Sequence, residues 1–238
     1  MSIWLSAIVI ATICYTAKHQ RSRASAATNA RTTSATRSQQ RGDEGETVVH
    51  AELLAALRWL CGDDFYLHPG ALLLNHAPGT DFPTAEVDHL AVTPFGIFIV
   101  ETKNWAGRIV PGPTEKMVVR IGVDGQREMR RSPLQQNRSK VTFLRAMLPG
   151  NWPVEGIAVF SHPGCEISSA LPLNLMRASD LRQWLRDRKS RHVAKGDLPI
   201  NVRHAQQMIL AVSKTASDAI ENHRSKVREN PKKLPLIS

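Results

Sequence analysis

Cysteine and aromatic residues are scarce in this sequence of 238 residues. Its three cysteines, Cys14, Cys61 and Cys165, lie far apart and include no CxxC pair, so neither a zinc site nor a disulfide framework is indicated. Aromatic residues make up 5% of the chain, and none alternate with the basic residues between positions 116 and 145, as they would in a site that stacks single-stranded bases. The chain therefore fits a reducing compartment, and its hydrophobic content of 42% is sufficient for a buried core.

Acidic residues are absent from residues 18–42, a segment rich in Ala, Ser, Thr and Arg that has no sustained hydrophobic period. This composition predicts a basic flexible tether, which we assign to residues 18–41. The whole chain has 31 Lys and Arg against 21 Asp and Glu, a formal net charge of +10. Six of the positive charges lie in the tether, at Lys18, Arg21, Arg23, Arg31, Arg37 and Arg41. The net charge is therefore compatible with an anionic membrane surface as well as with nucleic acid.

The longest uncharged run, IWLSAIVIATICYTA, extends from Ile3 to Ala17. As a helix it would span about 22 Å, less than the roughly 30 Å of a bilayer core, so it predicts a short membrane anchor over residues 1–17. Basic residues follow this run rather than precede it, which disfavours a secretory signal and places the rest of the chain in the cytoplasm, as a single-pass membrane protein. A leader lying on a surface and an organellar transit peptide are the alternative interpretations.

Beyond Gly42 the sequence takes on the pattern of a folded domain. Apolar residues recur at helical spacing over residues 43–60, and Gly62 is expected to end that helix. The further elements expected are strands at 70–75, 86–93, 96–103, 108–110, 116–122 and 154–160, and helices at 133–148, from Ser179 and Asp180, and at 202–220. Helix, strands, helix, strand, helix is an order typical of an α/β fold with a mixed central sheet covered by helices.

Two charged residues end an otherwise apolar predicted strand, GIFIVETK at 96–103. Glu101 and Lys103 are two positions apart and therefore share a face of that strand, where burial is costly unless they pair with each other, with a metal or with a substrate. Asp88 lies in the preceding apolar strand, and the tight turn at 94–96 would bring it close to Glu101. Without a metal one carboxyl pKa would rise, whereas a hard divalent cation such as Mg²⁺ would hold both groups ionised.

Such a cation can present water to a scissile phosphate and neutralise the charge that develops there. Lys103 would lie beside that water or phosphate, either to help deprotonate the nucleophile or to stabilise the phosphate electrostatically, and the sequence leaves both roles open. Glu46 lies on the same helical stripe as Val49 and Leu53, so it is a third candidate carboxylate, with a surface residue or cap partner as the alternative. His89 must point to the face opposite Asp88 and is expected to be structural.

Three blocks of sequence carry a family resemblance: GDEGE at 42–46, EVDHLAVTPFGIFIVETKNWAGRIV at 86–110, and SPLQQN at 132–137. Their order resembles that of the nuclease-related domain (NERD) family, which is thought to belong to the PD-(D/E)xK nuclease superfamily. The resemblance covers about residues 42–150. It departs from the family at Ser132, where Asn is frequent, and from the wider superfamily at Val87, where Pro is common.

The resemblance implies a restriction-endonuclease-like core and a Mg²⁺- or Mn²⁺-dependent hydrolysis of phosphodiester bonds. It also implies roles for individual residues. Asp88, Glu101 and Lys103 would be catalytic, with Asp88 and Glu101 as metal ligands, Glu46 and Gln136 as auxiliary catalytic residues, and the backbone carbonyl of Thr102 as a further metal ligand.

Basic residues are concentrated between Lys116 and Arg145. We expect part of this set to hold the phosphate backbone of nucleic acid, although a solvated surface accounts for the pattern equally well. The residues selected are Lys116, Arg130, Arg131, Arg138 and Lys140.

Together these observations predict a hydrophobic anchor helix at 1–17, the tether at 18–41, a nuclease-related domain at 42–160 and an α-rich extension packed on it at 161–238. The expected function is a divalent-metal-dependent nuclease, acting on DNA and held at the membrane through residues 3–17. A nucleic-acid-binding module that does not cut and a membrane adaptor are the alternatives. The oligomeric state is left open.

Overall fold

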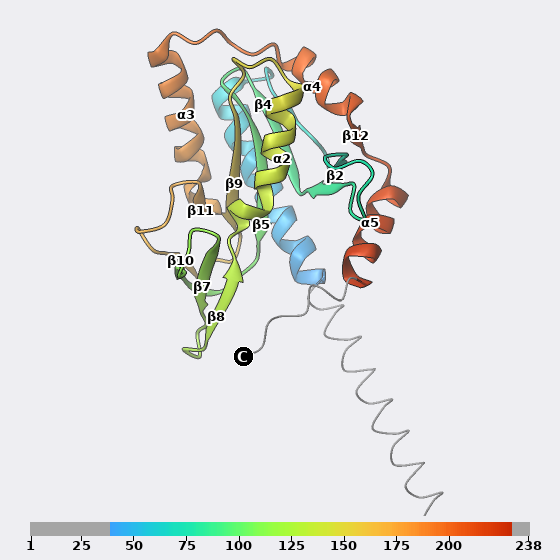
Figure 1. Cartoon of the computed structure of the whole chain (residues 1–238). Coiled ribbons are helices and arrows are strands. Elements are labelled where there is room, and N and C mark those ends of the chain that lie inside the picture. The colour runs from blue at the N-terminus through green and yellow to red at the C-terminus, as the bar shows by residue number, and fades with distance from the viewer. Residues whose placement is uncertain (1–38, 230–238) are drawn as a thin grey trace, which may run out of the picture. The chain divides into compact units, whose positions relative to one another are not determined.

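The computed structural model describes residues 39–229 (Figure 1). The chain divides into two compact units, residues 1–43 and 44–238, and the fold given below is that of the second. The predicted anchor at 1–17 and the predicted tether as far as residue 38 lie outside the described residues. Between residues 39 and 229, no helix is both long and apolar enough to cross a membrane.

The first helix is described from residue 39 to residue 61, and Gly62 follows it with a positive φ of 61°. The elements after it are β1 (Tyr66–Leu67), β2 (Leu72–Leu74), β3 (Ala85–Val87), β4 (His89–Thr93), β5 (Gly96–Lys103), β6 (Gly107–Pro111), β7 (Met117–Ile121) and β8 (Arg127–Arg131). They continue as α2 (Pro133–Met147), β9 (Val154–Phe160), β10 (Cys165–Ile167), β11 (Leu175–Arg177), η1 (Ala178–Asp180), α3 (Leu181–Lys195), α4 (Val202–Ala211), β12 (Ser213–Lys214) and α5 (Ser217–Glu229).

A mixed five-stranded sheet in the order β1-β4-β5-β9-β11 forms the centre of the fold, which confirms the predicted α/β class. β5 pairs antiparallel with β4 and parallel with β9. The first helix and α3 pack on one face, around Phe98 and Val100, while α2 and α4 pack on the other, around Ile97 and Ile99 (Figure 1). Successive residues of β5 alternate between two helical layers, so every second side chain of this strand faces α2.

The predicted strand at 86–93 is wrong in one respect, because the chain bends at Asp88. β3 pairs with β2 in a separate sheet of order β12-β2-β3, whereas β4 belongs to the central sheet. At the bend the Asp88 side chain accepts a hydrogen bond from the Thr102 amide of β5. A side-chain acceptor thus takes the place of regular strand pairing at this residue.

The predicted helix at 202–220 is also wrong, since it is interrupted by β12. β12 pairs antiparallel with β2, and the hydroxyl of Ser213 donates a 2.7 Å hydrogen bond to the carbonyl of Ile209 at the end of α4. The helix expected from Ser179 and Asp180 is a 3₁₀ turn, η1, followed by the 15-residue α3. α3 buries Leu181, Leu185 and His192.

A third sheet, of order β10-β6-β7-β8, lies beyond the carboxyl end of β5 (Figure 1). The sequence did not predict β8, which follows the expected turn at Gly125. Gly107 opens β6 with φ 92°, and a Cβ there would lie 2.1 Å from the Ile121 carbonyl oxygen, so a side chain is excluded. This tight entry sets the third sheet against the end of β9, where Phe160 packs on Ile109 and Val118.

Candidate active site

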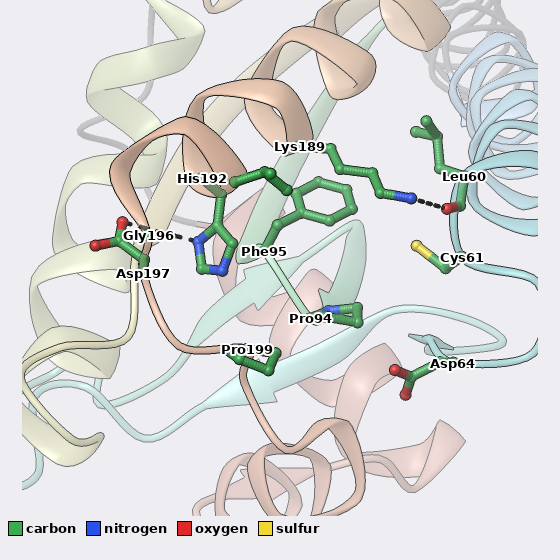
Figure 2. Close-up of a pocket in the computed structure, with 11 residues that line it drawn as sticks. Leu60, Cys61, Asp64, Pro94, Phe95, Lys189, His192, Gly196, Asp197 and Pro199 are labelled. Carbon is green, nitrogen blue, oxygen red and sulfur yellow. Dashed lines mark hydrogen bonds and ion pairs between the residues drawn. The ribbon is translucent and has the colours of Figure 1, made fainter.

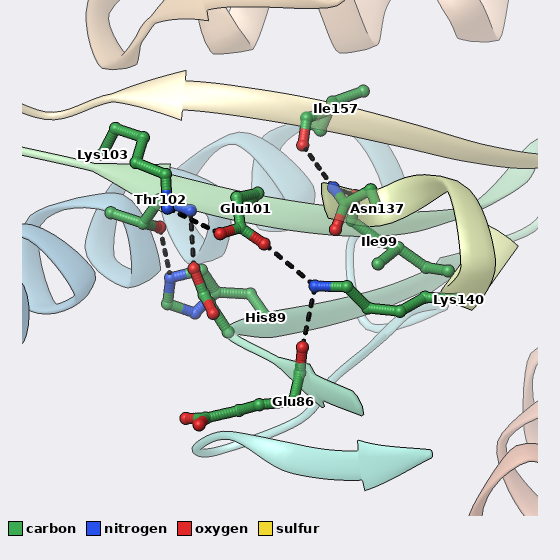
Figure 3. A network of polar contacts seen from close by, with 10 residues as sticks. Glu86, His89, Ile99, Glu101, Thr102, Lys103, Asn137, Lys140 and Ile157 are labelled. Carbon is green, nitrogen blue, oxygen red and sulfur yellow. Dashed lines mark hydrogen bonds and ion pairs between the residues drawn. The ribbon is translucent and has the colours of Figure 1, made fainter. Parts of the chain in front are cut away.

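On the side of β5 that faces α2, the first half of the strand carries Ile97 and Ile99, and its end carries Glu101 and Lys103. The Glu101 carboxylate is 7% exposed and accepts hydrogen bonds at both oxygens (Figure 3). Lys103 Nζ donates to Oε1 at 2.6 Å, and Lys140 Nζ, from α2, donates to Oε2 at 2.9 Å. Lys140 Nζ also donates to the Glu86 carbonyl at 2.7 Å. A single buried carboxylate is thus held between two ammonium groups.

Asp88 joins this cluster from the bend between β3 and β4. Its Oδ2 accepts the Thr102 amide hydrogen bond at 2.7 Å. Burial and the nearby Glu101 carboxylate together raise the pKa of Asp88 to about 8, from an ordinary value of 3.8. The structure therefore brings Asp88, Glu101 and Lys103 together, as the sequence predicted for the two strand ends.

The pKa values of Glu101 and Lys103 shift in the direction opposite to the one that burial alone would cause. Burial alone would raise the pKa of Glu101, but Lys103 and Lys140 outweigh it and lower that pKa. Burial alone would lower the pKa of Lys103, but the Glu101 and Asp88 carboxylates raise it. At neutral pH Glu101 is a carboxylate and Lys103 an ammonium ion, while Asp88 holds its proton.

Glu46 lies at the edge of the cluster, near the start of the first helix. Its negative charge contributes to the raised pKa of Lys103, and its Oε2 lies 3.9 Å from Nη2 of Arg224 in α5. Gly45 allows this placement, because a Cβ there would lie 2.7 Å from Ser161 Oγ and 3.0 Å from Asn104 Cβ. Only a residue without a side chain lets the helix pass so close to the ends of β5 and β9.

Helix α2 carries three polar residues of interest, Gln136, Asn137 and Lys140, and the sequence identified the first and the last of them. Gln136 is partly buried, and its side chain forms no hydrogen bond within residues 39–229. Sequence reasoning missed Asn137, whose Nδ2 donates to the carbonyls of Ile99 and Ile157 at 3.0 and 2.9 Å (Figure 3). An asparagine in the first turns of an amphipathic helix, where it is a poor helix former, was the available signal.

The structure places the five residues expected to bind nucleic acid in two different environments. Lys116, Arg130, Arg131 and Arg138 are exposed on the third sheet and on α2, and Arg130 Nη2 lies 2.8 Å from Glu128 Oε2. Lys140 is instead 4% exposed and bonded to Glu101. The four exposed residues are open to a polyanion, whereas Lys140 is part of the carboxylate cluster.

His89 lies on the face opposite Asp88, as expected. Its Nε2 lies 3.1 Å from Thr102 Oγ1, and both side chains are buried (Figure 3). Burial, followed by the effect of His50, lowers the pKa of His89 to about 4, so the ring is neutral at physiological pH. With its side chain engaged by His89, Thr102 can contribute to the cluster through its backbone.

The donor set suits a hard divalent cation. Residues 39–229 contain no group of three or more His, Cys, Asp or Glu side chains that would hold a metal on their own. Mg²⁺, however, commonly uses one or two carboxylates and completes its shell with water and substrate phosphate. The carboxylates of Asp88 and Glu101 would repel each other if both were ionised, and a bound cation would offset that repulsion. It would have to displace a lysine from Glu101.

A separate pocket of about 500 Å³ lies between the end of the first helix and α3 (Figure 2). Lys189 Nζ donates to the Leu60 carbonyl there, and His192 Nδ1 lies 3.8 Å from Asp197 Oδ2. Burial raises the pKa of the Cys61 thiol to about 11, which keeps it protonated. None of the residues that line this pocket belongs to the carboxylate cluster.

Comparison with known proteins matches residues 41–161 to the nuclease-related domain. An uncharacterized protein of Bacillus anthracis is 27% identical over 84 residues, which are 35% of this chain and 39% of the relative. The aligned part of the chain thus spans well under half of that relative's length. No solved structure matches the chain.

Proposed function

This chain belongs to the nuclease-related domain family, and from that premise we propose that it is a divalent-metal-dependent nuclease that hydrolyses phosphodiester bonds in DNA. The observation that carries the proposal is the crowding of Asp88 and Glu101 beside Lys103 at the end of the central strand β5. Two acids and an amine on a mixed sheet flanked by helices are the arrangement expected of a restriction-endonuclease-like core.

Asp88 and Glu101, with the backbone carbonyl of Thr102, would hold Mg²⁺ or Mn²⁺. When bound, the cation supplies Lewis-acid activation of water and neutralises charge on the phosphate. Asp88 would bind the cation as a carboxylate. Lys103 would face the reacting phosphate. Its ammonium group would stabilise the negative charge that develops on that phosphate.

Lys140 keeps Glu101 in place from α2 and is fixed in turn by the Glu86 carbonyl. Glu46 and Gln136 would act as auxiliary residues. The Gln136 amide makes no hydrogen bond within residues 39–229, so it is available to orient a water molecule or a phosphate oxygen. Lys140 would thus fix the carboxylate that holds the cation, while Gln136 would contact the substrate.

The exposed residues Lys116, Arg130, Arg131 and Arg138 would bind the DNA backbone through its phosphates. They lie on β8, on the β6–β7 connection and on the first turns of α2, and these segments meet where the Ser132 amide donates to the Lys116 carbonyl. This surface would position a duplex without reading its sequence.

Residues 3–17 would anchor the protein, with the basic tether on anionic headgroups and the nuclease domain at 42–160 in the cytoplasm. The extension at 161–238 would complete the core, since α3 and α4 supply Leu181, Leu185 and Ile209 to it.

Cell fractionation tests the anchor. The full chain should stay with membranes in high salt and a chain without residues 1–41 should not. Release of the full chain by salt would refute the anchor.

Incubation with circular and linear DNA, and with RNA in parallel, tests the proposed activity. The protein is supplied with Mg²⁺, with Mn²⁺ or with a chelator, and is compared with Asp88→Asn, Lys103→Met and Arg58→Ala. Arg58 is exposed and forms no ion pair within residues 39–229, so it serves as the control. We expect metal-dependent DNA cleavage that both site variants abolish and the control retains. Cleavage that persists in Asp88→Asn would refute the assignment, and DNA binding without cleavage would favour the non-catalytic alternative.

A further inference from the structure

Helix α5 lies beyond the part of the chain that matches the family domain, yet it reaches the carboxylate cluster. No residue of the helix is fully buried, although Ile220 and Val227 are half-buried, and polar contacts tie it to the cluster. His223 Nδ1 lies 2.9 Å from Thr84 Oγ1, and Arg224 donates through Nε and Nη2 to Glu86 Oε1 at 2.9 and 2.5 Å. Arg224 Nη2 also lies 3.9 Å from Glu46 Oε2. α5 runs beside the small sheet that contains β3 (Figure 1).

Arg224 differs from the other two cations of the site in its exposure. Its side chain is 28% exposed, against 18% for Lys103 and 5% for Lys140, both of which are bonded to Glu101. A guanidinium group can engage two acceptors at once through its planar fork, and it matches the oxygens of a phosphate as well as those of a carboxylate. Arg224 is thus the side chain of this cluster best placed to meet a phosphate arriving from solvent.

The charges next to Arg224 favour the same role. Its Nη2 lies 3.9 Å from Glu46 Oε2 and 2.5 Å from Glu86 Oε1, so two carboxylates hold the guanidinium group at the edge of the cluster. A divalent cation bound beside these carboxylates would add positive charge and favour an arriving phosphate. Loss of Arg224 would remove one positive charge from this edge and weaken that attraction.

We propose that Arg224 is a phosphate-binding residue of this site, supplied from outside the family domain, and that Glu46 and Glu86 hold it in place until a backbone phosphate of the substrate arrives. The inference rests on the proposed nuclease function and extends it, because it assigns the ligand of one oxyanion beside the metal site to the C-terminal helix. It makes α5 part of the substrate site.

The test uses the full chain with three changes in α5. Arg224→Met removes the cation, and Arg224→Lys keeps a charge without the fork. His223→Ala loosens the helix contact to Thr84 and leaves Arg224 in place. Arg228→Met, at an exposed arginine that pairs with Glu221 in the same helix, is the control. The measurements are KM and kcat for DNA cleavage, DNA affinity with Ca²⁺ in place of Mg²⁺, and Mn²⁺ affinity without DNA.

We expect Arg224→Met to raise KM and to weaken DNA affinity by about 10- to 100-fold, the loss typical of a charge-assisted hydrogen bond, with kcat changed by less than about threefold. Its Mn²⁺ affinity should be unchanged or tighter, because a repelling positive charge is gone. Arg224→Lys should recover part of the affinity. His223→Ala and Arg228→Met should resemble the unaltered protein.

Unchanged KM and DNA affinity in Arg224→Met would overturn the inference. An equal loss in His223→Ala would also overturn it, because docking of the helix would then account for the effect. Failure of the proposed function gives a different pattern. If the unaltered protein binds DNA without cutting it, the nuclease proposal fails, while the comparison of affinities still decides the role of Arg224. A protein that binds no DNA at all refutes both.

Discussion

Arg138 and Lys140 lie two positions apart in α2, yet the first is exposed and the second is 4% exposed and bonded to Glu101. Two positions in an α-helix correspond to about 200° of rotation, so the two side chains point to opposite sides of α2. One contributes to an open basic surface, and the other neutralises a buried acid. Neighbouring positive charges in a sequence can therefore serve unrelated purposes, and single substitutions at the two positions should have different effects.

The largest effect is expected at Glu101, the buried carboxylate that would hold the cation. Glu101→Gln removes the charge that would hold a cation and leaves two ammonium groups facing a neutral amide. We expect the rate of DNA cleavage to fall by about 1,000-fold or more, with DNA affinity retained within a few fold. Arg131→Gln, at an exposed position, should change the rate by less than about tenfold. Steady-state cleavage assays compare the two, and similar losses would contradict the division into two sets.

The next effect concerns stability. Lys140→Met leaves the Glu101 carboxylate with one partner and the Glu86 carbonyl with none from Lys140, and the cost should be about 3 kcal/mol of the free energy of unfolding. Arg138→Met should change that free energy by less than about 0.5 kcal/mol. Urea denaturation measures both. The double variant Lys140→Met with Glu101→Gln should recover part of the loss, and strictly additive effects would show that the pair is not coupled.

Asp88 gives the site a pH dependence of defined sign. Its pKa is about 8 in the folded protein and near 3.8 in the unfolded chain, so the folded state binds more protons between these values. Stability should therefore fall as pH rises from about 4 to about 8, and then level off. Asp88→Asn keeps an acceptor for the Thr102 amide and removes the titration.

At pH 8 without metal, Asp88→Asn should be more stable than the unaltered protein by at least about 1 kcal/mol, or roughly 2–4 °C in melting temperature. Melting curves recorded in chelator at a series of pH values test this expectation. The gap between the two proteins should narrow toward acidic pH. A gap that stays constant with pH would show that Asp88 ionises normally in the folded protein.

The smallest effect belongs to the exposed set. Each phosphate contact that is lost should reduce the slope of log affinity against log salt concentration by about 0.9 for duplex DNA, with a loss of affinity of a few fold at moderate salt. Arg130→Ala and Arg131→Ala should lower the slope, whereas Lys140→Met should leave it unchanged. Fluorescence anisotropy at several salt concentrations measures it. An unchanged slope in the two arginine variants would assign these residues to a solvated surface.

The sequence predicted β5 over its full length, because the GIFIVETK strand is preceded by a clear turn and alternates against two helical layers. The meeting of Asp88 with Glu101 followed from the same hairpin. The bend at Asp88 could not be predicted, since VDHLAV is a continuous β pattern and its pairing depends on β2, an element distant from β5. The strand is interrupted at Asp88, where the side chain of this residue accepts a backbone hydrogen bond from Thr102 in place of regular strand pairing.

The partners of the site were harder to predict than its central residues. Lys140 was expected on the surface because its neighbours in sequence are basic, and its contact with Glu101 joins residues 39 positions apart. Arg224 meets Glu86 across 138 positions, and nothing local to either residue indicates that contact. Patterns within one helix or strand identify which residues are suited to the chemistry. Contacts between distant elements decide which of them are buried, paired or exposed.

Gly45 lets the first helix lie close to the ends of β5 and β9. A helix normally loses about 1 kcal/mol when glycine replaces alanine at an interior position, so this residue weakens the helix that carries it. In return, the backbone approaches Ser161 and Asn104 so closely that an added Cβ would lie 2.7 Å from Ser161 Oγ and 3.0 Å from Asn104 Cβ. A larger residue would push this part of the first helix away from the sheet and would move Glu46 with it. The position of the Glu46 carboxylate therefore depends on the absence of a Cβ atom at Gly45.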